Sequence, residues 1–367
     1  MSNRELLDNL FDRDLIDIRR GALFDTEPGP LAPSFGFDKI EGLMLGLAVG
    51  DALGNTSEGL LPGERRARYG EIRDYLPNGR AAGRRAGLPS DDSQLAFWTL
   101  ERMLADCGFN PERVAECFCR RQIYGIGATV RQFIINYRTG AGEWHRCGPK
   151  SAGNGALMRI APMVIPHLAG GGRELWADTA LSAMITHNDS ASIASCLAAV
   201  NLIWRLLPLS APPEAGFWVE SFVQTARELE RDDSYAPRGG RFASYRGPLW
   251  RFVQERVPAA LAQGHSVLEA CQSWLSGAFL LETVPCVLFI LERHGHSFEE
   301  AVVRAVNDTK DNDTIAAIVG ALAGALHGKA GIPKRWLAGL AGRTGRDDDG
   351  RIFQLLDQAR SLWWKAG

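Results

Sequence analysis

The sequence predicts an all-α protein built around one large core. From Phe37 onward, apolar residues recur at spacings of three and four, which is the period of an α-helix. Alternating apolar and polar stretches, which are typical of strands, are scarce. Loops rich in Gly and Pro separate the periodic segments without a fixed repeat length. We therefore expect a compact orthogonal bundle of many short helices.

Residues 1–37 are predicted to form an acidic N-terminal extension, and residues 38–367 the main domain. In the extension, Leu7, Leu10 and Phe11 share one face at helical spacing, and the proline-containing segment TEPGPLAPSFG follows as an extended connection. In the main domain the first helix is EGLMLGLAVGDALG. Further helices are expected at 91–106, 111–122, 152–165, 174–186, 191–207, 217–230, 282–293, 297–306, 312–327 and 351–364.

Glycine recurs at every fourth residue in two of the predicted helices, EGLMLGLAVGDALG and AIVGALAGALHG. Each glycine inside a helix costs about 1 kcal/mol of stability relative to alanine, so such a row needs a structural reason. Close approach of another helix provides one. We expect these two helices to cross at the centre of the molecule and to bring their acidic ends together.

Composition and charge exclude several classes of protein. The 367-residue chain is 46% hydrophobic and 23% charged, with a net charge of -2, so it has no general attraction for nucleic acid or anionic lipid. Its longest apolar runs fall short of the roughly 20 residues that span a bilayer, and its N-terminus does not resemble a signal peptide. Seven cysteines without a C-x-x-C pair favour a reducing cytoplasm.

Acidic clusters stand at the ends of three predicted helices: Asp51 with Glu58, Ser90 with Asp91 and Asp92, and Asp311 with Asp313 and Thr314. One such cluster alone is typical of a helix cap. Three together favour a site for hard cations such as Mg²⁺ or Mn²⁺, which bind carboxylate and hydroxyl oxygens. The number of oxygen ligands is consistent with two ions. The run Asp347–Asp349, flanked by arginines and glycines, is typical of a solvated turn instead.

Two loops of small residues complete the candidate site. In GPKSAGNGALMR, small side chains surround Asn154 at an expected helix start, where free N–H groups suit a diphosphate or a ribose hydroxyl. YGIGATVRQ is a second loop that contains small residues. The alternative for both is a tight turn that leads into a helix. Taken alone, His187 is more typical of a hydrogen-bonded structural histidine than of a ligand contact.

Four motifs in this order resemble the ADP-ribosyl-glycohydrolase family, over residues 38 to 330. They are GLAVGDALG with Glu58 after it, SDDSQ, SAGNGALMRIAP and NDTKDNDTIAAIVGALAGALHG, and MITHNDS matches a shorter signature. The resemblance implies a helical fold with a dinuclear Mg²⁺ or Mn²⁺ site. It also implies removal of ADP-ribose from modified arginine. Thr309-Lys310 replaces a Gly-Gly pair of the family, and Asn55-Thr56 replaces a small residue followed by proline.

The resemblance assigns roles to individual residues. The implied metal ligands are Ser90, Asp91, Asp92, Asp311, Asp313 and Thr314. The implied candidates for the general base that activates water are Asp92, Asp311 and Glu58. Contacts to the substrate are expected from Asp51, Gly125, Gly127, Ser151, Gly153, Asn154, Gly155, Met158, Arg159 and His187.

The preferred hypothesis is a metal-dependent hydrolase that reverses an ADP-ribosyltransferase acting on protein arginine, in the role of an immunity protein against an ADP-ribosylating toxin. A serine-linked or small-molecule ADP-ribose is an alternative substrate. A second alternative is a binding protein whose N-terminal arm, with eight acids against four arginines through Asp38, neutralises a toxin by contact.

The arginine-rich loops GERRAR and GRAAGRR are typical of solvated surface, or they attract a diphosphate or an acidic protein. Residues 232–250 are a candidate cover for the site.

Overall fold

A computed structural model describes residues 1–31, 35–140, 143–170, 172–231, 234–346 and 349–364. Over these residues the chain forms sixteen α-helices, several 3-10 turns and no strand, which confirms the all-α prediction. The helices are α1 (Asn3–Asp12), α2 (Asp38–Gly54), α3 (Pro62–Tyr69), α4 (Asp91–Asp106), α5 (Pro111–Arg120), α6 (Ala128–Arg138), α7 (Glu174–Thr186), α8 (Ser190–Leu206), α9 (Phe217–Leu229), α10 (Leu249–Ala262), α11 (Val267–Ser273), α12 (Leu280–His294), α13 (Phe298–Asp308), α14 (Asn312–His327), α15 (Lys334–Gly339) and α16 (Arg351–Trp363).

One predicted helix is wrong. Residues 152–165 form two 3-10 turns, Leu157–Arg159 and Ala161–His167, instead of an α-helix. Pro162 and Pro166 lack the N–H groups that an α-helix would need there, and glycines precede the first turn. The short helices α3, α6, α11 and α15 and the longer α10 were not predicted, and the solvated turn expected at 347–349 falls partly outside the described residues.

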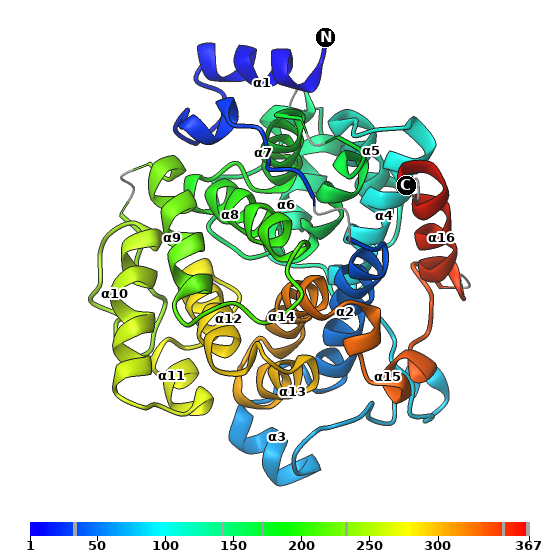
Figure 1. The fold of residues 1–367 in the computed structure, drawn as a ribbon, viewed down its shortest axis with the longest axis vertical. Coiled ribbons are helices and arrows are strands. Elements are labelled where there is room, and N and C mark those ends of the chain that lie inside the picture. Colours follow the sequence, from blue (N-terminus) through cyan, green and yellow to red (C-terminus); the bar gives the residue numbers. More distant parts are fainter. Residues whose placement is uncertain (32–34, 141–142, 171, 232–233, 347–348, 365–367) are drawn as a thin grey trace.

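Helices α2 and α14 lie side by side at the centre of the molecule (Figure 1). They run antiparallel, because Gly42 lies opposite Gly324 whereas Gly46 lies opposite Gly320. A Cβ atom placed on Gly46 would stand 2.1 Å from the carbonyl oxygen of Gly320. Both glycine rows therefore mark backbone-to-backbone contact, as the sequence predicted. The antiparallel arrangement brings the end of α2 to the start of α14.

The other helices surround this pair. Helices α12, α13 and α8 pack against α14, and α4 packs against α2. Both central helices are buried over nearly their whole length, including their polar ends at Asp51 and Asp313. This enclosure places the acidic ends inside the protein, at the junction of α2, α4 and α14.

The N-terminal extension packs against the body. Helix α1 lies on α7, with Leu7 and Leu10 buried between them. Several acids of the extension form ion pairs with arginines of the same chain: Asp8 with Arg20, Asp25 with Arg4, and both Asp14 and Asp17 with Arg231. The described part of the extension is thus an apolar packing element whose acids are largely compensated internally.

None of the described helices has the length and hydropathy needed to cross a membrane. All seven cysteines carry free thiols, and six of them are buried.

The contact between α2 and α14 predicts a large effect of one methyl group. Gly46→Ala should lower the free energy of unfolding by about 3 kcal/mol or more, because the added carbon meets backbone that cannot move without separating the two helices. Urea denaturation followed by circular dichroism would measure the change. The matched control is Gly63→Ala in α3, where nothing lies within 4 Å of the added Cβ. Equal stability of the two variants would contradict the contact.

Candidate active site

The start of α4 is held by a carboxylate from α2. Asp51 accepts hydrogen bonds from the backbone N–H groups of Ser90 and Ser93 at 2.8 and 3.2 Å, and from both of their hydroxyls at 2.6 Å. Asp51 is fully buried, and it takes the place of a capping side chain that Ser90 does not itself provide. Because Ser90 donates its proton to Asp51, the lone pairs of its hydroxyl oxygen are free to accept. Asp51 therefore fixes the direction in which Ser90, Asp91 and Asp92 are presented.

The start of α14 is anchored in the same region. The Nδ2 atom of Asn312 donates to the carbonyl of Gly54 at 3.0 Å and to the hydroxyl of Ser57 at 3.1 Å, which joins α14 to the end of α2. Asn154 donates to Asp311 at 2.7 Å. Asp313 and Thr314 are buried beside these contacts. The six implied metal ligands thus come from two helix starts that meet at the end of α2.

The carboxylates in this region raise one another's pKa. Burial is the largest cause, and the charge of Asp51 adds to it for Asp91, whose pKa rises to about 7. The pKa of Asp311 rises to about 6, and those of Asp92 and Asp313 lie well above the ordinary value, in each case with burial first and neighbouring carboxylates contributing. Burial and Asp51 also raise the pKa of Glu58. Such a cluster favours the binding of positive charge or of protons.

A cavity of about 240 Å³ opens beside the cluster. Its wall includes three acids of the clusters, Glu58, Asp91 and Asp311, together with Thr314. Eight of the expected substrate-binding residues also line it: Gly125, Gly127, Ser151, Gly153, Asn154, Gly155, Met158 and His187. Asp51 and Arg159 do not line it, since both are fully buried behind the wall. Of the three candidate bases, Glu58 and Asp311 face the cavity, whereas Asp92 lies deeper.

The small-residue loop leads into the 3-10 turn Leu157–Arg159 and not into an α-helix, which corrects the helix start expected at Asn154. Its backbone N–H donates to the carbonyl of Ala278 at 3.2 Å, and Gly153 forms an isolated bridge with Phe279. The small residues instead allow the loop backbone to pass close to the ring of His187. A Cβ atom on Gly155 would lie 3.0 Å from Cε1 of His187, so the loop passes directly beside the histidine ring.

Arg159 orients His187 from behind the cavity. Its Nη2 donates to the Thr186 hydroxyl at 2.9 Å, and that hydroxyl lies 2.9 Å from Nδ1 of His187. Because Thr186 accepts from a guanidinium, its single proton is free to be donated to Nδ1. This arrangement favours the tautomer with the ring proton on Nε2, the nitrogen nearest Gly153. Arg159 is therefore a positioning residue, and His187 offers an N–H donor toward the cavity.

Arg238 is a cavity residue that the sequence analysis did not single out. It belongs to the 232–250 segment and lines the cavity, with its guanidinium 5.4 Å from the Phe279 ring centroid. Its backbone N–H, Nε and Nη2 all donate to the carboxylate of Glu282, which is fully buried in the first turn of α12. A lone acid in the apolar helix sequence LLETVPCVLFIL was the signal that a cation must approach it. The segment thus contributes one wall of the site.

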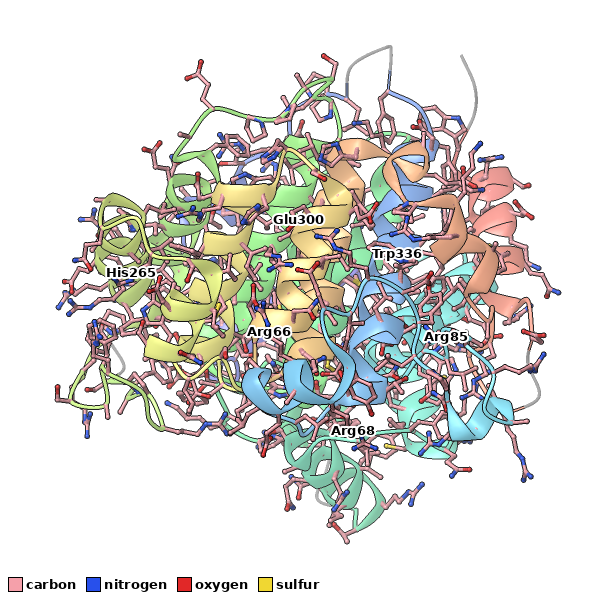
Figure 2. All side chains as sticks on the ribbon, turned by 90° about the horizontal axis from the view of Figure 1, so that it is seen from below. Arg66, Arg68, Arg85, His265, Glu300 and Trp336 are labelled. Atoms are coloured by element: carbon pink, nitrogen blue, oxygen red, sulfur yellow. The ribbon has the colours of Figure 1, made fainter. Side chains whose placement is uncertain are left out.

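The arginine-rich loops are only partly solvated surface. Arg66 and Arg68 on α3 and Arg85 in the following loop are exposed, and Figure 2 labels them on the underside of the molecule. Arg65, in contrast, is fully buried and donates to the carbonyls of Val306 and Thr309 at the end of α13. Lys310 is exposed, so its stem carries the ammonium away from the acidic cluster.

The acidic cluster has the chemistry of a hard-cation site without a complete ligand shell. Over the described residues, no three His, Cys, Asp or Glu side chains are already arranged to hold a metal ion. The donors are nevertheless all oxygens, two of them hydroxyls, and Oδ1 of Asp92 is buried without a hydrogen-bond partner. A buried acceptor of this kind needs a cation or a proton. The residues present therefore fit a divalent ion such as Mg²⁺ or Mn²⁺.

Fold and site together define a helical protein with a carboxylate-rich cavity walled by loops of small residues. The model of the ADP-ribosylglycohydrolase family matches residues 33–364. The chain belongs to this family, whose members are hydrolases.

Three similar proteins extend this assignment. A protein from Rhodospirillum rubrum named ADP-ribosyl-[dinitrogen reductase] glycohydrolase is 27% identical over 87% of this chain and 96% of its own length. A protein from Pseudomonas putida (strain GB-1), named ADP-ribosylarginine hydrolase Tri1, is 26% identical over 85% of this chain and 76% of its own length. A solved structure described as an ADP-ribosylglycohydrolase-related protein complex has a TM-score of 0.63 at 25% identity and covers 90% of this chain and 99% of that chain.

The buried position of His187 predicts a pH dependence of stability. Burial, with a smaller contribution from Arg159, lowers the pKa of His187 to about 3. An unfolded histidine titrates near ~6.5, so the unfolded chain binds one more proton between these values and the folded state loses stability as the pH falls below ~6.5. One proton corresponds to a slope of about 1.4 kcal/mol per pH unit.

His187→Gln should remove this contribution. Between pH 6.5 and 5, the free energy of unfolding of the variant should fall less steeply than that of the parent, by up to about 1.4 kcal/mol per pH unit. Urea titrations of both proteins at several pH values would measure the two slopes, and any constant loss from the substitution cancels in the comparison. Parallel curves would show that His187 titrates alike in the folded and unfolded chains.

Proposed function

We propose that the protein is a divalent-metal-dependent hydrolase that removes ADP-ribose from ADP-ribosylated arginine in proteins. The observation that carries the proposal is the meeting of two acidic helix starts at the wall of a cavity that is lined by loops of small residues. The names of the relatives from Pseudomonas putida and Rhodospirillum rubrum support an ADP-ribosyl substrate, and the first of them supports arginine.

The acidic cluster would hold two Mg²⁺ or Mn²⁺ ions through Ser90, Asp91, Asp92, Asp311, Asp313 and Thr314. When bound, such ions compensate the buried carboxylates and fix the hydroxyl oxygens of the ribose. Their presence would relieve the repulsion that raises the pKa values of Asp92 and Asp313.

The chain's own residues then position the substrate. In the tautomer with its proton on Nε2, His187 would donate to the substrate beside the small-residue loop, and Asn154 holds Asp311 in place. Hydrolysis breaks the bond between the ribose carbon and the arginine nitrogen, and water supplies a hydroxyl to the carbon and a proton to the nitrogen. Asp311 and Glu58 are carboxylates on the cavity wall that can take the proton of the attacking water. The developing positive charge on the ribose is stabilised by the surrounding carboxylates.

The alternative of a binding protein that acts through its N-terminal arm has less support. The apolar face of α1 is buried on α7, and Asp8, Asp14, Asp17 and Asp25 are paired with arginines of the same chain. A toxin partner and a role in immunity stay predictions from the sequence. The catalytic proposal does not depend on them.

Linkage specificity provides the direct test. The full-length protein should release ADP-ribose from an arginine-linked substrate in the presence of Mg²⁺ or Mn²⁺, and release should stop after chelation. Serine-linked and nucleobase-linked ADP-ribose serve as comparison substrates in the same assay, with the product quantified by chromatography. Release from the serine linkage alone would reassign the substrate, and release from none of the three would refute the hydrolase proposal.

Metal binding can be tested without any substrate. Mg²⁺ or Mn²⁺ added to chelator-treated protein should raise the Tm by about 2 °C or more. Asp313→Asn should lose this shift, yet its metal-free form should melt no lower than the parent, because the amide removes one buried charge from a repulsive cluster. Asp357→Asn, on the exposed face of α16, is the control that should keep the shift. An unchanged shift in Asp313→Asn would exclude the cluster as the metal site.

A further inference from the structure

A second cavity, of about 410 Å³, adjoins the first. The two share Glu58 and Gly125 in their walls. Ser90 faces the second cavity, and its neighbour Asp91 faces the first, so the start of α4 separates them. The proposed function places the scissile bond beside Glu58, which lies in the shared wall, so the group beyond that bond can extend into the second cavity.

Two positively charged side chains line the second cavity. The guanidinium carbons of Arg80 and Arg343 lie 5.6 and 5.5 Å from the ring centroid of Tyr124, and all three residues line the cavity. Neither arginine forms an ion pair within the part of the chain that the structure describes. The Nε atom of Arg343 is buried without a hydrogen-bond partner. Arg238 in the first cavity differs, because Glu282 neutralises it.

The charges on the walls attract the arginine leaving group and the acidic residues around it to different places. An arginine side chain that leaves as a guanidinium is attracted by Glu58 on the shared wall and repelled by Arg80 and Arg343. The two arginines instead suit carboxylates, which bind a guanidinium through paired hydrogen bonds. Contact with the ring of Tyr124 limits the freedom of both guanidiniums and keeps each of them at this cavity.

We propose that the Arg80–Tyr124–Arg343 cavity binds acidic side chains next to the modified arginine of the protein substrate. The inference rests on the proposed function for the position of the leaving group. It adds a sequence preference, in which arginines flanked by Glu or Asp are the favoured targets. Arg80 comes from the arginine-rich loop GRAAGRR, which is thereby given a role in substrate selection.

Binding of an unmodified peptide tests this without catalysis. The probe is a fluorescein-labelled peptide with one central arginine flanked by two glutamates on each side, compared with the same peptide carrying glutamines. Fluorescence anisotropy with the full-length protein at low salt should show at least about tenfold tighter binding of the glutamate peptide, and the difference should shrink at high salt.

The double variant Arg80→Ala/Arg343→Ala should abolish that preference. The matched control is Arg227→Ala/Arg251→Ala, which removes two exposed arginines that lie 5.2 and 5.3 Å from the centroid of one ring, Trp250, and that do not line the cavity. Both double variants change the net charge by the same amount. The control should keep the preference of the parent.

The same variants in the hydrolysis assay show whether the two arginines act on the peptide part or on the ADP-ribose part of the substrate. Arg80→Ala/Arg343→Ala should lower kcat/KM at least about fivefold for an ADP-ribosylated glutamate-flanked peptide and leave free ADP-ribosyl-arginine unchanged. An equal loss on both substrates, or a preference that the control variant also loses, would overturn the inference. So would weaker inhibition by free ADP-ribose in the double variant, because the arginines would then hold the diphosphate. If no substrate is hydrolysed, the proposed function fails, and the anisotropy result still decides whether the cavity binds acidic peptide.

Discussion

The backbone contact between α2 and α14 is the constraint on which the rest of the structure depends. Glycine at both helices lets the carbonyl of Gly320 approach the position where a side chain on Gly46 would stand, and the same spacing continues to the ends of the pair. At the end of α2, the Cα of Asp313 lies only 2.4 Å from where a Cβ on Gly54 would be. The start of α14 can therefore reach Asp51 and Glu58 only because no side chain separates the helices.

This proximity produces the electrostatic character of the site. Burial raises the pKa of Asp91, Asp92, Asp311 and Asp313, and in each case neighbouring carboxylates raise it further. Free N–H groups at the starts of α4 and α14 stabilise part of this buried negative charge. The carboxylate of Asp51 is already hydrogen-bonded to N–H groups at the start of α4. The remaining repulsion is what a divalent cation would relieve.

The sequence predicted this centre well and its surroundings less well. The glycine rows and the acidic clusters are local patterns whose physical cost is visible without a structure, so both the central helix pair and the convergence of the acids could be inferred. Asp51 and Arg159 also stood out, but their roles depend on burial, and sequence alone could not show that they support the cavity from behind. Arg238 was missed because its partner, Glu282, is 44 residues away in the chain. The turns at 157–167 were mistaken for a helix because their apolar spacing hid the effect of two prolines.

Buried polar contacts behind the cavity walls hold several of the lining side chains in place. Arg159 donates to the Thr186 hydroxyl, which lies beside His187. Glu282 accepts from Arg238. Asp51 accepts from the hydroxyl of Ser90. Each support is buried, so the groups facing the cavities have little freedom to reorient when a ligand enters. Among the residues that the structure describes, Arg80 and Arg343 have no such carboxylate partner, and both contact the ring of Tyr124. The lining of the first cavity is therefore more preorganised than that of the second, whose two arginines have no carboxylate partner among the described residues.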